Sequence, residues 1–203
     1  MSEIAIGVII LAAGASTRMG EPKLLLRWGD TTMLGQVVRV WKCLRPEQIA
    51  VVHGAGDTPI TEELDRLAIQ AWDRIPNANP GEGMFSSVRC AALWKGWQTK
   101  LTHWAIVLGD QPHLDAALLA AVICYAERHP KMIVQPGLRG RPRHPVILPL
   151  EEFLELRQSK EPTLKAFLEK RKVKLYELEN DSLDFDIDTP DDYQRGLKQF
   201  PPS

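Results

Sequence analysis

The sequence has few of the features that mark several large protein classes. Its three cysteines, Cys43, Cys90 and Cys124, are scattered without a C-x-x-C pair, which argues against a disulfide framework or a zinc site and favours a reducing compartment. The apolar run Ile4–Leu11 is far shorter than the ~20 residues that span a bilayer, and it is accompanied by neither a basic segment nor a small-residue cleavage site. We therefore expect a cytoplasmic protein that has no membrane partner.

An excess of charge of one sign is also missing. Lys and Arg together number 25 and Asp and Glu 26, so the formal net charge is −1 and the chain has no global basic field for nucleic acid. No internal repeat, low-complexity tract or linker interrupts its 203 residues, a length that suits one domain with a substantial core. We predict a single domain over residues 1–203 that does not bind nucleic acid.

Apolar runs of strand length alternate along the chain with segments of helical spacing. Ile4–Leu11 is almost continuously apolar, which is typical of a strand buried on both faces of a parallel sheet. The other predicted strands are Ile49–His53, Trp104–Leu108, Met132–Gln135, Val146–Leu148, Val173–Leu178 and Phe185–Ile187. The predicted helices are Met33–Leu44, Glu62–Ala68, Met84–Trp97, Ala116–Arg128, Glu151–Arg157, Thr163–Lys170 and one that begins at Pro190. This alternation predicts an α/β domain with a doubly wound, mostly parallel sheet, whose ligands bind at the carboxyl ends of the strands.

The loop after the first predicted strand is small and basic, with the sequence LAAGASTRMGEPKLLL over Leu11–Leu26. The small residues Ala12–Gly14 let the backbone approach a ligand, and consecutive N–H groups in such a turn can cradle anionic oxygens. Arg18 and Lys23 add positive charge. Neither the Walker A pattern nor G-x-G-x-x-G is present. The loop is either a phosphate-binding turn, which its strand-end position favours, or a plain turn with solvated basic side chains.

Aspartates occupy two later positions of the same kind. Asp110, in LGDQP, follows a predicted buried strand and either holds a divalent cation such as Mg²⁺ or caps the turn. Asp186 and Asp188 alternate with Ile187, so on a strand both carboxylates would share one face and repel each other unless a cation lies there. The alternative for this pair, slightly favoured when the pair is taken alone, is a solvated edge strand followed by a helix cap.

Two further loops combine charge or glycine with a strand or helix end. Arg139–Pro145, RGRPRHP, carries three arginines and a histidine, which either grip an anionic ligand or form a solvated loop. Asn79–Val88, NPGEGMFSSV, places glycines ahead of a predicted helix N-terminus, where a polar or anionic ligand or an ordinary cap is expected.

Together these motifs resemble those of the MobA-like nucleotidyltransferases. The motifs are LAAGxSxRMGxxK, GMxxS, LGDQP, HPV and DxDTP, in that order from Leu11 to Tyr193. Within the family they are most similar to the motifs of the molybdenum cofactor cytidylyltransferases. The resemblance implies a three-layer, Rossmann-like nucleotide-diphospho-sugar transferase fold. It also implies Mg²⁺-dependent transfer of a nucleoside monophosphate from an NTP to a phosphorylated acceptor, with release of pyrophosphate.

The resemblance also implies a role for each matching residue. Base and ribose would contact Leu11, Ala12, Ala13 and Gly14, and the triphosphate would contact Arg18 and Lys23. Mg²⁺ would bind Asp110 with Asp186 or Asp188. The nucleotide or acceptor pocket would be lined by Gly83, Met84 and Ser87, with Arg141, Arg143 and His144 on the acceptor side. Arg18, Lys23 and Asp110 would be catalytic through charge neutralisation. In the family, CTP users carry Ala-Ala-Gly at this position and GTP users carry Ala-Gly-Gly. The triplet Ala12–Gly14 therefore points to CTP. The implied partners are CTP, a molybdopterin acceptor, and a molybdoenzyme or chaperone client.

The chain departs from the cytidylyltransferase pattern on the acceptor side. Arg143 stands where glycine is usual before His-Pro, and residues 159–164 replace a Gly-Asp-x-Gly-Ala-Arg stretch. Three functions therefore stay open on the sequence. They are transfer of CMP to molybdopterin, nucleotidyl transfer to a sugar phosphate or another small phosphomonoester, and a non-catalytic nucleotide- or cofactor-binding delivery module. The set of Lys23, Asp110 and Asp186/Asp188 argues against the last.

Overall fold

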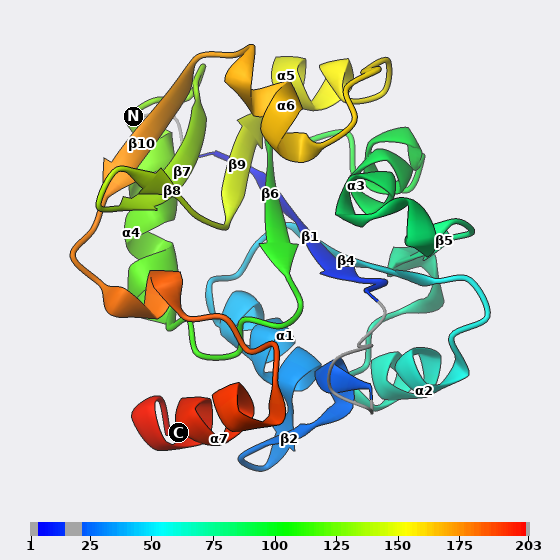
Figure 1. The fold of residues 1–203 in the computed structure, drawn as a ribbon. Helices are drawn as coiled ribbons and strands as arrows, with labels where there is room; N and C mark the ends of the chain where they lie inside the picture. The colour runs from blue at the N-terminus through cyan, green and yellow to red at the C-terminus, as the bar shows by residue number, and fades with distance from the viewer. Residues whose placement is uncertain (1–3, 15–21, 202–203) are drawn as a thin grey trace.

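The computed structural model describes residues 4–14 and 22–201, and in these ranges helices enclose a central eight-stranded sheet (Figure 1). The strands are β1 (Ile6–Ala12), β4 (Gln48–Gly54), β5 (Arg74–Asn77), β6 (His103–Leu108), β7 (Ile133–Leu138), β8 (Arg141–Pro142), β9 (Val146–Pro149) and β10 (Val173–Glu177). Their order is β10-β7-β9-β6-β1-β4-β5, with β8 paired to β7. The pairs β1–β4, β1–β6, β4–β5 and β7–β10 are parallel, whereas β9 is antiparallel to β6 and β7. The expected α/β fold with a mostly parallel sheet is confirmed.

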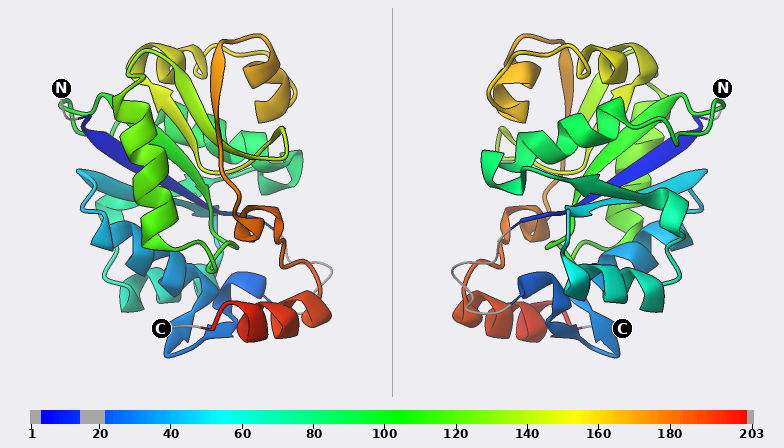
Figure 2. Two further views of the ribbon diagram at one scale, coloured as in Figure 1. Left: turned by 90° about the vertical axis from the view of Figure 1, so that its left-hand side faces the viewer. Right: turned by 90° about the vertical axis from the view of Figure 1, so that its right-hand side faces the viewer.

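Helices cover both faces of the sheet, because the central strands alternate buried side chains between two cores. Val8 and Ile10 of β1 belong to one core, and Ile9 and Leu11 to the other. The first core is shared with α1 (Met33–Cys43), α2 (Thr58–Arg66) and α4 (Ala116–Glu127), and the second with α3 (Met84–Leu93), α5 (Leu150–Glu155) and α6 (Leu164–Glu169). Figure 2 shows the resulting three layers from two sides. No helix in the described ranges is long and apolar enough to cross a membrane.

The last helix lies outside these layers. α7 (Pro190–Gln199) runs beside the small hairpin of β2 (Arg27–Trp28) and β3 (Thr31–Thr32), as both views of Figure 2 show. Trp28, Met33 and Ile187 form a separate apolar cluster between them. Thr189 and Asp192 close a reciprocal capping box at the N-terminus of α7. The helix therefore fixes the segment that precedes it, which carries Asp186 and Asp188.

The strand order places the point where the connections reverse beside β1. The chain passes from β1 to β4 and β5 on one side and then returns to β6 on the other side of β1. Leu11 is in register with Leu108, and the Gly109 N–H donates to the Leu11 carbonyl over 3.0 Å. A Cβ atom on Gly109 would lie 2.8 Å from that carbonyl oxygen, so only glycine allows this approach. The crevice at the carboxyl ends of β1 and β6 is thus the expected ligand position of the fold.

The prediction of a strand at residues 185–187 is wrong. These residues have no strand partner and follow a 3₁₀ turn, η4 (Asp181–Asp184). The alternating pattern has another cause: Ile187 is buried against the hairpin and α7, while Phe185 packs against His113 and Phe200. Burial of one face needs only an apolar surface, whereas a strand also needs a free sheet edge.

Other differences concern element ends and short strands. The predicted helix over residues 84–97 ends at Leu93, where the side chains of Arg157 and Trp97 donate to the carbonyls of Ala92 and Ala91. The helix predicted at residues 62–68 is α2, which begins four residues earlier at Thr58 behind an Asp57 cap. β5 and the two-residue strands β2, β3 and β8 were not expected. They are too short to show a period-2 pattern.

Candidate active site

A lysine joins the two predicted carboxylate positions at the switch point. Lys23 begins a 3₁₀ turn, η1 (Lys23–Leu25), and its Nζ donates to Asp110 Oδ2 over 2.7 Å and to Asp188 Oδ1 over 3.2 Å. The Lys23 side chain is 12% exposed, against 33% for Asp110 and 49% for Asp188. Three segments far apart in the sequence therefore meet in one charged cluster, which opens to solvent on its carboxylate side.

The charges of this cluster shift the pKa of its members. Burial lowers the pKa of Lys23, but the Asp110 charge and the hydrogen bonds to Asp110 and Asp188 outweigh it, so the pKa is raised above 10.5 and the ammonium stays charged. Burial, and then the negative charges of Asp110 and Asp188, raise the pKa of Asp186. Asp186 is thus close enough to both carboxylates to feel their repulsion. A further cation among these three groups would relieve it.

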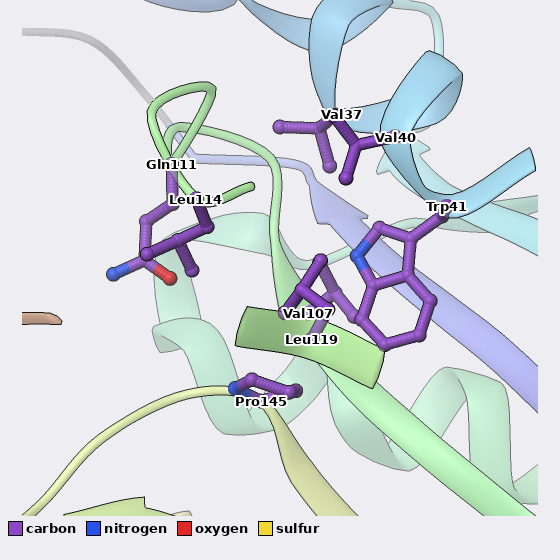
Figure 3. A pocket seen from close by; sticks show the side chains of 8 residues that line it. All are labelled: Val37, Val40, Trp41, Val107, Gln111, Leu114, Leu119 and Pro145. Atoms are coloured by element: carbon purple, nitrogen blue, oxygen red, sulfur yellow. The ribbon is translucent and has the colours of Figure 1, made fainter. Parts of the chain in front are cut away.

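The loop that carries Asp110 is held in place by its own buried side chains. Gln111, His113 and Leu114 are 8%, 7% and 6% exposed, so the loop buries three side chains within four residues of Asp110. Figure 3 shows the side chains that line a small cavity beside this loop, among them Gln111 and Leu114. The remaining lining residues come from α1, β6, α4 and the position just before β9: Val37, Val40, Trp41, Val107, Leu119 and Pro145. This lining is mostly apolar and is part of the core, and it gives the Asp110 loop a rigid base.

The carboxylates fit a magnesium ion that is shared with a phosphate ligand. Within the described residues, no group of three or more His, Cys, Asp or Glu side chains is arranged to hold a metal ion by itself. Mg²⁺, however, commonly takes only one or two carboxylates and completes its shell with water and substrate phosphates. Asp110 and Asp186 supply such oxygen donors, and their mutual repulsion favours a divalent cation between them. Asp188 instead shares the lysine with Asp110.

The arginines of the β7–β9 loop are paired with aspartates of the η4 turn. Arg139 Nη2 donates to Asp181 Oδ1 over 2.8 Å, and Arg143 donates to Asp184. The hydrogen bond and charge of Arg143 lower the pKa of Asp184, and the Arg143 charge also acts on Asp186. Arg143 therefore lies at the border of the carboxylate cluster, whereas Arg141 is exposed on β8.

His144 lies at the base of the same loop and reaches toward β6. Its Nδ1 is 3.3 Å from the Ile106 carbonyl, so Nδ1 carries the proton in this contact. Burial lowers the pKa of His144, and the charge of Asp110 opposes this in part. The imidazole is therefore neutral near pH 7 and lies within electrostatic reach of Asp110. The structure thus brings six predicted site positions to one edge of the sheet: Lys23, Asp110, Arg143, His144, Asp186 and Asp188.

The predicted pocket residues of α3 lie at the N-terminus of that helix. Gly83 has φ +91° and precedes the helix, Met84 is 43% exposed, and Ser87 is buried. Asn77, at the end of β5, donates to Ser87 Oγ over 3.0 Å and to Ser86 Oγ over 2.8 Å. Asn77 is 1% exposed and was not predicted, because the four-residue β5 gives no strand signal before it. It fixes the helix N-terminus, whose backbone N–H groups suit an anionic or polar ligand.

The remaining predicted residues lie at the end of β1. Leu11 and Ala12 are buried, Ala13 is half-buried and Gly14 is exposed, so the backbone emerges from the sheet at this triplet. Among the described residues, a Cβ atom on Gly14 would meet nothing within 4 Å. Arg18, predicted to contact the triphosphate, lies outside the described residues.

The three layers around a mostly parallel sheet are those of the Rossmann-like fold of nucleotidyltransferases. The chain belongs to the family described as the MobA-like NTP transferase domain, whose model matches residues 8–175. This confirms the resemblance drawn from the motifs.

Individual relatives agree with this assignment. The molybdenum cofactor cytidylyltransferase of Escherichia coli is 30% identical over 200 residues, which are 97% of each chain. The crystal structure of Rv0371c from Mycobacterium tuberculosis in complex with manganese superposes with a TM-score of 0.72 at 25% identity, covering 95% of this chain and 98% of that one. The bifunctional protein GlmU of Paracoccus denitrificans is 28% identical over 150 residues. That match covers 70% of this chain but only 32% of GlmU, so the chain spans about a third of that relative's length.

Proposed function

We propose that this nucleotidyltransferase transfers CMP from CTP to the phosphate of molybdopterin and releases pyrophosphate. The observation that carries the proposal is the placement of Lys23 between Asp110 and Asp188 at the switch point of the sheet. This pairs a fixed cation for a polyphosphate with oxygen donors for a divalent cation. The 30% identity to the E. coli cytidylyltransferase over 97% of both chains supports the choice of donor and acceptor. The manganese in Rv0371c supports a divalent cation.

In this proposal, an acceptor phosphate oxygen attacks the α-phosphorus of CTP. A new P–O bond forms while the bond to the departing pyrophosphate breaks, so positioning and charge neutralisation supply most of the catalysis. Lys23 holds the phosphates of CTP, and the resemblance assigns Arg18 to the same phosphates. Asp110 and Asp186 would hold Mg²⁺, which when bound would supply neutralisation of charge on the phosphate oxygens. The N-terminus of α3 and the triplet Ala12–Gly14 hold base and ribose.

A second acceptor class is favoured by Arg143. The Arg143 guanidinium is next to Asp184 and within electrostatic reach of Asp186, at a position where the resembled family usually has glycine. An extra cation here suits a small phosphomonoester such as a sugar phosphate, since arginine pairs with phosphate through two hydrogen bonds. The donor chemistry is the same for both acceptors.

Release of pyrophosphate tests the proposal. The protein is incubated with each of the four NTPs and Mg²⁺, first alone, then with molybdopterin, and then with a panel of sugar and polyol phosphates. We expect release only with CTP and molybdopterin. Release with CTP and a small phosphomonoester instead would transfer the function to the second class. If the protein binds CTP but releases no pyrophosphate with any acceptor, it is not an enzyme for these substrates, and the non-catalytic delivery module becomes the favoured function. An Asp110→Asn protein serves as the inactive control.

A further inference from the structure

The carboxylates of the site come from two segments that the sheet does not hold together. Asp110 belongs to the 109–115 loop after β6, and Asp186 to the 181–187 segment, which has no strand partner. Burial raises the pKa of Asp186, and the negative charges of Asp110 and Asp188 raise it further, so like charges oppose the approach of the two segments. Lys23 bridges Asp110 to Asp188, and a direct contact between the two segments would further fix the separation of Asp110 and Asp186.

His113 makes that contact. Its Nε2 lies 3.0 Å from the Ser182 carbonyl oxygen, and because a carbonyl can only accept, Nε2 carries the proton. Among the described residues, this is the one hydrogen bond that joins the 109–115 loop to the 181–187 segment. The ring also packs edge-on against Phe185, with centroids 5.4 Å apart, and lies tilted against Phe200, with centroids 5.2 Å apart. His113 thus touches the residue next to Asp186 from a position three residues after Asp110.

The ring of His113 is buried between aromatic side chains and is shielded from solvent. It is 7% exposed, and its Nδ1 is buried without a hydrogen bond to any described residue. A leucine would fill the same apolar space without leaving an unpaired nitrogen, at the cost of the directional bond to Ser182. The histidine therefore contributes direction in addition to volume.

We propose that His113 is a positioning residue, which sets the separation between Asp110 and Asp186 by hydrogen bonding to the Ser182 carbonyl and packing on Phe185. The inference rests on the proposed function, because it assumes that these carboxylates bind a divalent cation. Groups that orient metal ligands in this way typically change metal affinity by about 10- to 100-fold when removed.

The test measures binding of Mn²⁺ alone to the full chain by electron paramagnetic resonance. His113→Leu removes the hydrogen bond and keeps the apolar volume, so we expect Mn²⁺ affinity to fall by about 10-fold or more. In His113→Gln the amide nitrogen can occupy the place of Nε2 and donate to Ser182, so we expect affinity within about 3-fold of the wild type. The matched control is His129→Leu, which also removes a histidine bonded to a backbone carbonyl, that of Tyr125, away from the site.

The outcomes separate this inference from the proposed function. If the wild type binds no Mn²⁺, or if the Asp110→Asn protein binds Mn²⁺ as well as the wild type does, the proposed function loses its metal site. If the wild type binds Mn²⁺ and His113→Leu binds it equally well, the positioning role is overturned and the proposed function stands. If His113→Leu does not fold, His113→Asn replaces it, because its shorter amide cannot reach the place of Nε2; equal affinity in the Asn and Gln variants would also overturn the inference.

Discussion

The Lys23 ammonium and the Asp110 carboxylate lie 2.7 Å apart, although 87 residues separate them in the chain. Lys23 is fixed by a 3₁₀ turn, and Asp110 by the buried side chains that follow it. Each group is held in place by its own segment, so this ion pair differs from one between two mobile surface side chains. The half-exposed Asp188 completes the bridge. This arrangement gives the site a fixed positive charge beside two fixed negative ones.

Replacing Lys23 by alanine should lower kcat/KM for CTP by about 10- to 100-fold, since a hydrogen bond to a charged group is worth about 1.5–3 kcal/mol. The change removes the cation that faces the phosphates and leaves Asp110 and Asp188 unopposed by it. Steady-state kinetics at fixed Mg²⁺ measures the effect. Lys100→Ala is the control, because Lys100 pairs with Glu47 and is 58% exposed. Unchanged constants for the Lys23 variant would leave this lysine a structural role only.

Replacing Asp110 by asparagine should reduce turnover by about 10²–10³-fold while the protein stays folded, as expected when one preorganised charge contact is lost. The side chain is one-third exposed at 33%, so the substitution opens no core cavity. Turnover and Mn²⁺ binding should fall together. Asp65→Asn, which breaks the exposed ion pair with Arg74, should leave both intact. Near wild-type turnover in a folded Asp110→Asn protein would contradict the assignment of Asp110 as a ligand of the divalent cation.

The stability of the protein should depend on pH through His113. Burial lowers the pKa of His113 from 6.5 to about 4, so between these values the unfolded chain binds the proton and the folded chain does not. Stability therefore rises with pH through this window and is lost as pH falls from 6.5 towards 4, by up to about 3 kcal/mol for a group this well buried.

His113→Gln lacks this titration and isolates it from those of His103 and His144, whose pKa values are also lowered by burial. Urea unfolding of the wild type and the variant at a series of pH values provides the measurement. We expect the free energy of unfolding of the wild type to fall relative to that of the variant as the pH drops from 6.5 to 4. Parallel curves for the two proteins would contradict the burial of a neutral ring.

Much of the fold could be predicted because its strands are long apolar runs. Ile4–Leu11 and Trp104–Leu108 lie within one residue or two of β1 and β6, and their strand ends located Asp110. Residues 185–187 show the limit: their alternation reports burial against α7 and the hairpin, and a period alone cannot tell which partner buries a face. β5 is too short and contains Pro76, so the edge of the sheet was missed.

The site was predictable where a motif carried its residues and not where a contact made them important. Lys23, Asp110 and Asp188 were all expected, and the structure joins them by hydrogen bonds. Asn77 and His113 were not expected, because each acts through a neighbour that only the tertiary fold supplies: Ser87 for Asn77 and Ser182 for His113. The carboxyl partners of the arginine loop, Asp181 and Asp184, were missed for the same reason.

CTP should be preferred over GTP. The half-buried Ala13 stands at the end of β1, between the buried Ala12 and the exposed Gly14. If the base binds at this triplet as proposed, the Ala13 methyl group takes space that a purine would need. Ala13→Gly should therefore raise kcat/KM for GTP relative to that for CTP, since removing the methyl makes room for a purine. Pyrophosphate release with each nucleotide is the readout, and Ala121→Gly on α4 is a control away from the site. Equal or better use of GTP by the wild type would refute both the preference and its steric basis.

Arg143 gives the sharpest test of the acceptor side. Its guanidinium donates to Asp184, its backbone N–H donates to the Pro136 carbonyl over 2.8 Å, and its carbonyl accepts from Gln135. The residue is thus held in place at the border of the carboxylate cluster, on a different loop from Lys23. A second anion, that of the acceptor, would compete with Asp184 for this guanidinium and could pair with it through two hydrogen bonds.

Arg143→Gly should therefore weaken acceptor binding by about 1.5–3 kcal/mol, or about 10- to 100-fold in KM, while the KM for CTP stays the same. Glycine keeps the backbone N–H and carbonyl contacts possible and removes the side chain that carries the cation. Asp184→Asn is the complementary variant: it weakens the competitor and should lower the KM for the acceptor. Arg139→Gly, which removes an exposed ion pair with Asp181, should change neither constant. If the Arg143 variant loses affinity for CTP instead, the two subsites have been assigned in reverse, and if neither KM moves, the Arg143–Asp184 pair only holds the η4 turn to the loop.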